Sequence, residues 1–236
     1  IHMFESLNGY KDSEKQIENS YAKVLGQEKY RNIRQLQVGD VFTLGTYEQD
    51  NDMANGKEEI EWVILEKSGM SFLVISKYAL DYQPYHKYYT KTTWETCELR
   101  KWLNEDYLHA AFSEDEQKMI LKTTVTADKN PYFDISPGND TIDKVFCLSI
   151  KEVNEYFTSD ESRQCALTDY AAARGRLVIR DDDSGAKYPS AWWLRSPGRS
   201  IVDAAIVRGN GTVYDSGLFV DSDEVSVRPV LWIKIG

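Results

Sequence analysis

The fold is decided by two stretches near the end of the chain, Tyr188-Pro-Ser-Ala-Trp-Trp-Leu-Arg-Ser-Pro-Gly198 and Ser226-Val-Arg-Pro-Val-Leu-Trp-Ile-Lys234. Residues 191–194 and 227–233 are short apolar runs, rich in aromatic and β-branched residues and closed by turn formers, a pattern typical of buried strands. Arg195 follows the first run and Arg228 lies in the second. Because an unpaired buried guanidinium costs several kcal/mol, we expect both to meet carboxylates or backbone carbonyls.

The chain before these stretches alternates strand and helix signals. Ser113 with Glu116 and Ser149 with Glu152 have the spacing of capping boxes that open helices, and the run from Thr92 to Glu95 has the same pattern. Asn210-Gly211 is a strong type I′ hairpin signal. Apolar runs predict strands at residues 38–45, 60–66, 71–78, 123–127 and 145–148, and Ser68-Gly69 predicts a hairpin between the second and third of them. The sequence therefore predicts an α+β fold.

Residues 1–30 have a different pattern from the rest of the chain, with helix signals alone. Two short helices separated by Asn8-Gly9-Tyr10 are predicted there, which gives a short N-terminal helical appendage. The segment resembles the end of a tetratricopeptide-like helical repeat, which implies upstream repeats of the same chain as partners. The start Ile1-His2-Met3 indicates an excised fragment. The location stays open, with a cell-envelope-anchored or secreted protein slightly favoured over a cytoplasmic one.

Several motifs follow one another along the chain. They are Ile60-Glu-Trp-Val-Ile-Leu65 and Glu98-Leu-Arg-Lys-Trp-Leu-Asn104, and later Thr168-Asp-Tyr-Ala-Ala-Ala-Arg-Gly175, Ala191-Trp-Trp-Leu-Arg-Ser-Pro-Gly198 and Val227-Arg-Pro-Val-Leu-Trp232. Together they resemble a bacterial family of unknown function, DUF6273. The resemblance covers about residues 37 to 235, so the predicted domains are an appendage at 1–30 and a DUF6273-like domain at 37–236. Ser226 departs from the family, which tends to have glycine there.

The resemblance implies a C-type-lectin-like domain with a mixed, mainly antiparallel sheet and packed helices, similar also to formylglycine-generating enzymes. It implies no established activity. Those enzymes use cysteines in the C-terminal half of the fold for copper, whereas no cysteine follows Cys165. The calcium and sugar signatures of the lectins, Glu-Pro-Asn and Trp-Asn-Asp, are absent as well. We therefore expect neither activity.

Composition narrows the function classes. The formal net charge of −10 repels phosphate backbones, and no basic cluster compensates, so we expect no nucleic-acid partner. No apolar run approaches the roughly 18 residues of a membrane helix, so we expect no membrane insertion by this segment. The odd, widely spaced Cys97, Cys147 and Cys165 suit neither a disulfide framework nor zinc, and we expect buried thiols.

The common sequence motifs of catalytic and metal sites are absent. There is no phosphate loop, nucleophile elbow, His-Glu-x-x-His or Cys-x-x-Cys. Acidic runs at Asp181–Asp183 and Asp221–Glu224 could supply oxygen ligands to calcium, but the complete loop pattern is missing. We read them as solvated acidic turns and predict no metal or cofactor.

A tyrosine-dense run, residues 82–92, leaves two alternatives open. It either lines a binding cleft or, more often, forms a long loop that covers the edge of a core, because tyrosine serves both burial and recognition.

The best candidate site is the surface of the C-terminal loops and strands. Alternation there is expected to send one set of residues inward and leave the other exposed. Aromatic residues beside arginine are typical of recognition surfaces, and the resemblance to variable proteins of retroelements points to the same region. The candidate ligand-binding residues are Trp193, Arg195, Arg199, Asp203, Asn210, Tyr214, Asp215, Phe219, Asp221 and Asp223.

Three functional hypotheses follow. The first is a noncatalytic recognition module that binds a protein or glycan ligand through this surface. The second is an enzyme of unassigned reaction in the same region, with Arg195 or Arg228 stabilising an anion and Asp203 as base, which would need a deep pocket. The third is a structural cap for a helical-repeat array.

Overall fold

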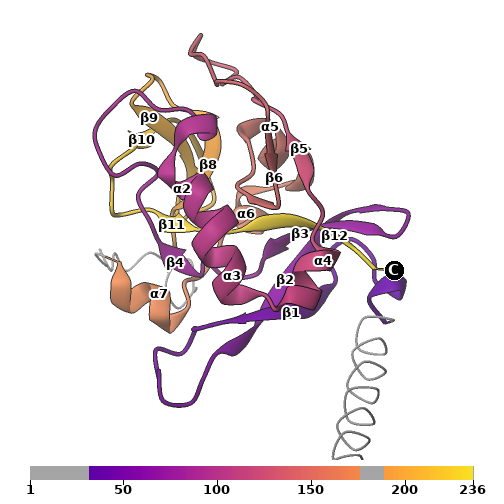
Figure 1. Cartoon of the computed structure of the whole chain (residues 1–236). Helices are drawn as coiled ribbons and strands as arrows, with labels where there is room; N and C mark the ends of the chain where they lie inside the picture. The colour runs from indigo at the N-terminus through magenta and orange to yellow at the C-terminus, as the bar shows by residue number, and fades with distance from the viewer. Residues whose placement is uncertain (1–31, 176–188, 236) are drawn as a thin grey trace, which may run out of the picture. The chain divides into compact units, whose positions relative to one another are not determined.

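The computed structural model describes residues 32–175 and 189–235 (Figure 1). Contacts divide the chain into two compact units, which are mainly residues 1–37 and residues 38–234. The described part of the first unit holds a 3₁₀ helix, η1 (Asn32–Gln35). The predicted appendage at residues 1–30 and the acidic turn Asp181–Asp183 lie outside the described residues. The second unit contains the strands β1 to β12.

The first sheet of this unit is antiparallel throughout. In spatial order its strands are β1 (Val41–Tyr47), β2 (Glu58–Ser68), β3 (Ser71–Ser76), β12 (Val230–Lys234) and β7 (Val145–Phe146). β2 and β3 form the predicted hairpin at Ser68-Gly69, where Gly69 has a φ of +61° that glycine adopts without strain. β12 pairs with both β3 and β7, so the last strand of the chain lies inside the sheet.

The second sheet is mixed. In spatial order its strands are β10 (Val213–Phe219), β9 (Asp203–Val207), β8 (Trp192–Pro197), β11 (Ser226–Val227) and β4 (Asp81–Tyr82). β11 runs parallel to β8, and the other pairs are antiparallel. A separate ladder joins β5 (Thr123–Val125) to β6 (Thr141–Asp143). The predicted α+β class with mainly antiparallel sheets is confirmed.

The second diagnostic stretch serves both sheets. The sequence predicts one strand over residues 227–233, but β11 ends at Val227 and β12 begins at Val230 in the other sheet. Pro229 separates the two strands, because its fixed φ and missing N–H interrupt a ladder. Its carbonyl still accepts a hydrogen bond from the Ser76 N–H at 2.9 Å. The prediction of a single strand is therefore wrong, and the short link joins the two sheets.

The helices are short, and two of the three capping predictions are confirmed. Ser113 and Glu116 cap α4, and Ser149 and Glu152 cap α5. The box predicted at Thr92–Glu95 is instead formed one residue later, by Thr93 and Thr96, because the Thr92 N–H donates to the Ile201 carbonyl at 3.0 Å. The helices are η2 (Trp94–Thr96), α2 (Glu98–Trp102), the π-helix η3 (Leu103–Tyr107), α3 (Leu108–Ala111), α4 (Glu114–Met119), α5 (Ile150–Tyr156), α6 (Asp160–Arg163) and α7 (Asp169–Arg174).

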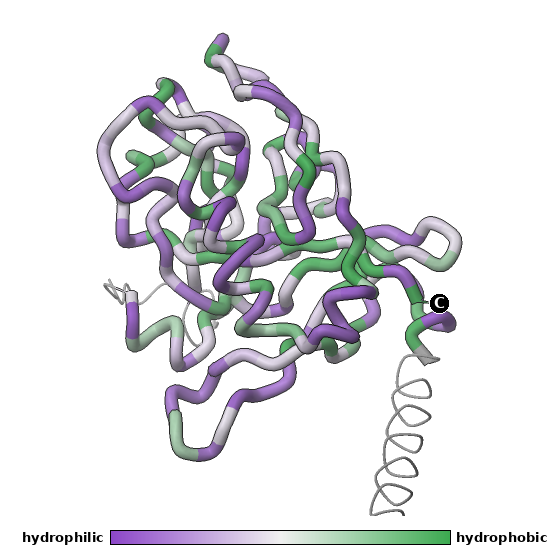
Figure 2. Tube along the Cα trace, in the orientation of Figure 1, coloured by the Kyte–Doolittle hydropathy of each residue, from purple (hydrophilic) through white to green (hydrophobic). Residues whose placement is uncertain are grey.

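The core of this unit is aromatic. Trp62, Trp192 and Trp193 are fully buried. The indole N–H of Trp62 donates to the Leu44 carbonyl at 2.8 Å, and that of Trp193 donates to the Gln83 carbonyl at 2.9 Å. Figure 2 shows hydrophobic positions gathered along β3 and β12, with mainly hydrophilic positions on the loop between β1 and β2. Tryptophans with satisfied N–H groups bury large areas without a polar cost, which fixes the strands that carry the C-terminal surface.

Candidate functional site

The ten predicted site residues divide by burial. Trp193, Arg195 and Asp203 are at most 4% exposed, so the expectation that they belong to an exposed face is wrong. The reason is that β8 and β9 are inner strands of the second sheet, buried along their whole length. The other seven are exposed or partly exposed: Arg199, Asn210, Tyr214, Asp215, Phe219, Asp221 and Asp223.

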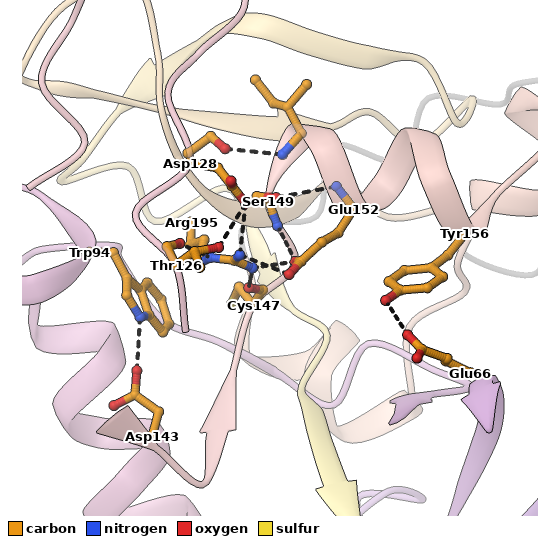
Figure 3. Close-up of polar contacts among 12 residues, drawn as sticks. Glu66, Trp94, Thr126, Asp128, Asp143, Cys147, Ser149, Glu152, Tyr156 and Arg195 are labelled. Atoms are coloured by element: carbon orange, nitrogen blue, oxygen red, sulfur yellow. Dashed lines mark hydrogen bonds and ion pairs between the residues drawn. The ribbon is translucent and has the colours of Figure 1, made fainter. Parts of the chain in front are cut away.

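Arg195 is the centre of a buried polar network (Figure 3). Its guanidinium forms a two-point ion pair with Glu152 of α5, in which Nη2 lies 2.8 Å from Oε1 and Nη1 contacts Oε2. Nη2 also lies 3.1 Å from Oδ2 of Asp128. Nε donates to the Thr126 carbonyl at 3.2 Å, and Nη1 donates to the Cys147 carbonyl at 3.0 Å. The expected carboxylate and carbonyl partners are therefore confirmed.

This network connects β8 to α5, to the segment that carries Asp128 and to Tyr85. Glu152 also caps α5 through Ser149, and the Ser149 hydroxyl donates to Asp128 at 2.8 Å. Tyr85 donates its hydroxyl to the Arg195 carbonyl at 3.1 Å. A planar guanidinium with its donors used in this way holds a structure together and has few donors left for a ligand.

Arg228, the other arginine of the diagnostic stretches, is also committed internally. Its Nε donates to the Ser76 carbonyl at 2.9 Å. Its guanidinium carbon lies 5.2 Å from the ring centroid of Trp192 and 5.7 Å from that of Phe157. At 4% exposure it has no access to a solute, which removes the anion-stabilising role considered for it.

Asp203 also has its partners within the protein. Its Oδ2 accepts a hydrogen bond from the Ser200 hydroxyl at 2.6 Å and lies 3.8 Å from Nε of Arg199. Its carbonyl accepts from the Gly198 N–H at 2.7 Å. These contacts close the turn between β8 and β9, so the carboxylate is not poised as a free base.

The hairpin between β9 and β10 is present, but its turn differs from the predicted type I′. That type needs positive φ at both central residues, whereas Asn210 lacks it and Gly211 has a φ of +86°. The Gly211 N–H donates to the Arg208 carbonyl at 2.8 Å, and the Arg208 N–H donates to the Thr212 carbonyl at 2.9 Å. The Asn210 side chain accepts from the Thr212 N–H, which stabilises a turn over Arg208–Gly211 with a bulge at the glycine.

A second irregularity in β10 separates its aromatic residues. Tyr214 pairs with Ile206, whereas Phe219 pairs with Asp203, and the register shifts between them. Paired residues share a face and positions three apart on β9 lie on opposite faces, so Tyr214 and Phe219 project to opposite sides of the sheet. Gly217, with a φ of +71°, allows the shift, since a Cβ there would lie 2.2 Å from the Ala204 carbonyl oxygen.

Three exposed aromatic residues, Tyr88, Tyr89 and Phe219, form what we call the aromatic patch. Their exposed fractions are 61%, 58% and 49%. The rings of Tyr89 and Phe219 meet edge to face, with centroids 5.1 Å apart and an interplanar angle of 90°. Lys87 places its ammonium 5.3 Å from the centroid of the Tyr88 ring. Half-exposed rings, some paired with each other and some with a cation, are typical of recognition surfaces.

The loop that carries the two tyrosines is held by its backbone. The His86 N–H donates to the Val220 carbonyl at 2.7 Å, and the Lys87 N–H donates to Oε2 of Glu98 at 2.7 Å. Tyr85 is buried, and the centroid of its ring lies 5.6 Å from that of Trp193. The tyrosine run therefore covers the core through Tyr85, whereas the next two tyrosines face solvent.

A second aromatic arrangement lies at the other end of β10. The Arg208 guanidinium stacks over the Tyr214 ring with its central carbon 3.9 Å from the centroid. Arg208 is exposed. Because Tyr214 projects from the opposite face to Phe219, this pair is separate from the aromatic patch.

The cysteines offer no ligand or nucleophile. Cys97, Cys147 and Cys165 are buried and free, as expected. Burial raises the pKa of Cys97 to about 12 and also raises the pKa values of the other two thiols above their ordinary value. Neutral thiols are poor nucleophiles and poor metal ligands.

Metal-ligating oxygens converge at one place among the described residues, in the loop between β1 and β2. Glu48, Asp50 and Glu58 each offer one carboxylate oxygen, and these oxygens lie within 4.8 Å of one another. The acidic run Asp221–Glu224, considered for calcium, forms no such group in the described part of the chain. The run Asp181–Asp183 lies outside it.

A concave site of about 360 Å³ lies beside α2 and β6. Its central charges pair with each other, since Nε of Arg100 lies 2.7 Å from Oδ1 of Asp143. Oδ2 of Asp143 accepts from the Trp94 indole at 3.0 Å and from the Thr141 hydroxyl at 2.6 Å. Internal donors therefore saturate the Asp143 carboxylate, so this group is not available as an acid or base.

Comparisons with known proteins identify the family. Residues 70–235 match the domain of unknown function DUF6273, and this match spans more than half of the chain. No curated protein and no solved structure matches the chain. No helix in the described ranges is long and apolar enough to span a bilayer. The chain therefore belongs to the DUF6273 family.

Proposed function

We propose that residues 38–234 form a noncatalytic recognition module that binds a protein or glycan ligand through the aromatic patch. The observation that carries the proposal is the exposure of Tyr88, Tyr89 and Phe219, of which Tyr89 and Phe219 are in ring contact, on a hydrogen-bonded backbone. Rings that are already ordered lose little conformational freedom on binding, so more of their contact energy is retained as affinity.

Charged groups beside the patch give it a means of selection. Arg199 is largely exposed, as are Asp221 and Asp223. The Val220 carbonyl, next to Asp221, accepts from the His86 N–H at the base of the tyrosine loop. A ligand with an apolar or sugar-ring face and polar substituents would meet rings at the centre and charges of both signs around them.

The finer assignments belong to the same proposal. A C-type-lectin-like fold would place recognition on C-terminal loops, in agreement with the location of Phe219 on β10. A bacterial cell-envelope or secreted setting, with upstream helical repeats that present the module, fits a binding role. The enzyme alternative has less support, since Arg195, Arg228 and Asp203 are buried with internal partners.

The experiment is a binding screen on arrays of glycans, bacterial cell-wall fragments and peptides. Wild type is compared with the double variant Tyr89→Ala/Phe219→Ala and with Tyr132→Ala as a matched control. Tyr132 is an even more exposed tyrosine, and it makes no ring contact with the patch in the described structure. Circular dichroism and thermal melting establish that all three proteins fold.

The proposal expects selective binding by wild type and Tyr132→Ala and its loss in the folded double variant. Binding that survives in the double variant would place recognition elsewhere. A folded wild type that binds nothing on any array would contradict the proposal and favour the enzyme or structural-cap hypothesis.

A further inference from the structure

The loop between β1 and β2 gathers negative charge at its base. Glu48 directly follows β1, Glu58 opens β2 opposite Tyr47, and Asp50 lies between them in the loop. One carboxylate oxygen from each lies within 4.8 Å of the other two. The hairpin register itself creates this convergence, because it sets the two ends of the loop side by side.

Glu48 is the unusual member of this carboxylate group. Its side chain is 6% exposed, and its Oε1 is buried with no hydrogen-bond partner. Buried carboxylate oxygens in proteins are normally satisfied by donors, cations or metal ions. A buried carboxylate with an unpartnered oxygen, grouped with two other carboxylates, therefore indicates a missing positive charge.

The nearest lysine in the sequence does not supply that charge. The Lys57 ammonium donates instead to the Ala110 carbonyl at 2.7 Å. Among the described residues, no ion pair joins a lysine or arginine to Glu48, Asp50 or Glu58. Within the described ranges, the negative charge of the group is thus not balanced by a basic side chain.

The other two carboxylates are already oriented. Oε2 of Glu58 accepts from the Gln49 N–H at 2.7 Å and from the Asp50 N–H at 3.3 Å. Asp50 accepts from the Asp52 N–H at 2.8 Å and from Nδ2 of Asn55 at 2.7 Å. Donors that orient carboxylates in this way are the supporting contacts usual around metal ligands, and each carboxylate keeps lone pairs for an ion.

We propose that Glu48, Asp50 and Glu58 form a calcium-binding site at the base of the β1–β2 loop. An all-oxygen, all-anionic set selects a hard divalent cation. Calcium fits better than magnesium, because it tolerates irregular geometry and completes six to eight ligands with water and backbone carbonyls. Bound calcium would also strengthen the link from this loop to α7, where the Tyr170 N–H donates to the Gln49 carbonyl at 2.9 Å.

The test uses the whole chain, stripped with a chelator and titrated with calcium by calorimetry. Glu48→Gln and Asp50→Asn each remove one ligand charge. Asp52→Asn is the matched control, because it removes the same charge from the same loop and Asp52 is outside the converging group. Thermal melting with and without calcium is recorded for each protein, and magnesium is titrated for comparison.

Wild type and Asp52→Asn are expected to bind one calcium, with Tm raised on the order of 5 °C at a hundredfold excess over Kd. Glu48→Gln and Asp50→Asn are expected to weaken binding at least tenfold. Without calcium, Glu48→Gln should melt above wild type, because it relieves repulsion among the carboxylates.

The site is contradicted if the stripped wild type shows no saturable calcium binding, or if folded Glu48→Gln and Asp50→Asn bind as well as wild type. Equal loss in Asp52→Asn would also contradict it, since the loop rather than these three ligands would then matter. Tighter binding of magnesium than of calcium would overturn the choice of ion. None of these outcomes depends on the aromatic patch.

Discussion

The Arg195 network and the aromatic patch belong to neighbouring parts of the second sheet, yet their side chains are used in opposite ways. Arg195 is 3% exposed, and its donors reach two carboxylates and two carbonyls (Figure 3). Tyr89 and Phe219 pack on each other and leave about half of each ring in solvent. Arginine and aromatic residues suit both cores and recognition surfaces. Burial and the number of satisfied partners decide which of the two roles a given residue has.

The two regions are joined through one tyrosine. Tyr85 donates to the Arg195 carbonyl, and the next residue, His86, begins the backbone contacts under the patch. The network therefore supports the patch without being part of it. Changes in the network should act mainly on stability, and changes in the patch should act mainly on binding.

The largest effect is expected for Arg195→Met, which keeps the apolar stem and removes the charge. Glu152 and Asp128 would be left without their cation, and breaking a buried pair in this way costs about 3–5 kcal/mol. Urea unfolding followed by tryptophan fluorescence measures the free energy of unfolding. The double variant Arg195→Met/Glu152→Gln should recover part of the loss, and failure to recover any would show that the ion pair is not its source.

A smaller loss of stability is expected for Asn130→Ala. Its Nδ2 donates to the carbonyls of Pro197 and Asp215 at 2.8 Å each, which links the edge strand β10 to β8. Orphaned acceptors of this kind cost about 1–3 kcal/mol. Hydrogen exchange should show faster opening of β10 than of β12, and equal protection of both strands in the variant would argue against this role.

Phe219→Ala is expected to change the free energy of unfolding by no more than about 0.5 kcal/mol, as is usual for surface positions. Chemical unfolding of this variant beside wild type measures the difference. A loss as large as that of Asn130→Ala would mean that the ring supports the fold, and the contrast between patch and network would fail.

The smallest effect is expected from thiol reagents. Burial raises the pKa of Cys97 to about 12 from an ordinary value of 9.0, so the thiol stays protonated at neutral and mildly alkaline pH. Ellman's reagent should label none of the three cysteines in the native protein at pH 8 and all three after unfolding. As the folded pKa is raised, the associated stability is present below pH 9 and is lost as the pH rises toward 12. Rapid native labelling would contradict the burial.

Local signals predicted the fold well where both partners are close in sequence. Capping boxes at Ser113 and Ser149 and the hairpin at Ser68-Gly69 depend on residues a few positions apart. The sequence also predicted that Arg195 and Arg228 need partners, because a buried charge without a partner costs free energy. It did not predict which residues those partners are, because Glu152 lies 43 residues from Arg195 in sequence.

The site was predicted less well for two physical reasons. Strand alternation tells the two faces apart but does not tell an inner strand from an edge strand, so Trp193 and Asp203 were assigned to the surface. Tyr214 and Phe219 are five positions apart on β10, so strand alternation already sets them on opposite faces, although both were assigned to one surface. Tyr88 and Tyr89 were missed as site residues, although their run was noted, because a tyrosine run suits covering and binding equally.

The most direct test of the account is the affinity of the best ligand from the arrays for wild type, Phe219→Ala and the control Tyr132→Ala, measured by calorimetry. Phe219→Ala is expected to have a Kd at least tenfold higher than that of wild type and an unchanged melting temperature. Tyr132→Ala is expected to have an affinity within about twofold of wild type. An unchanged Kd in folded Phe219→Ala would contradict recognition through the aromatic patch.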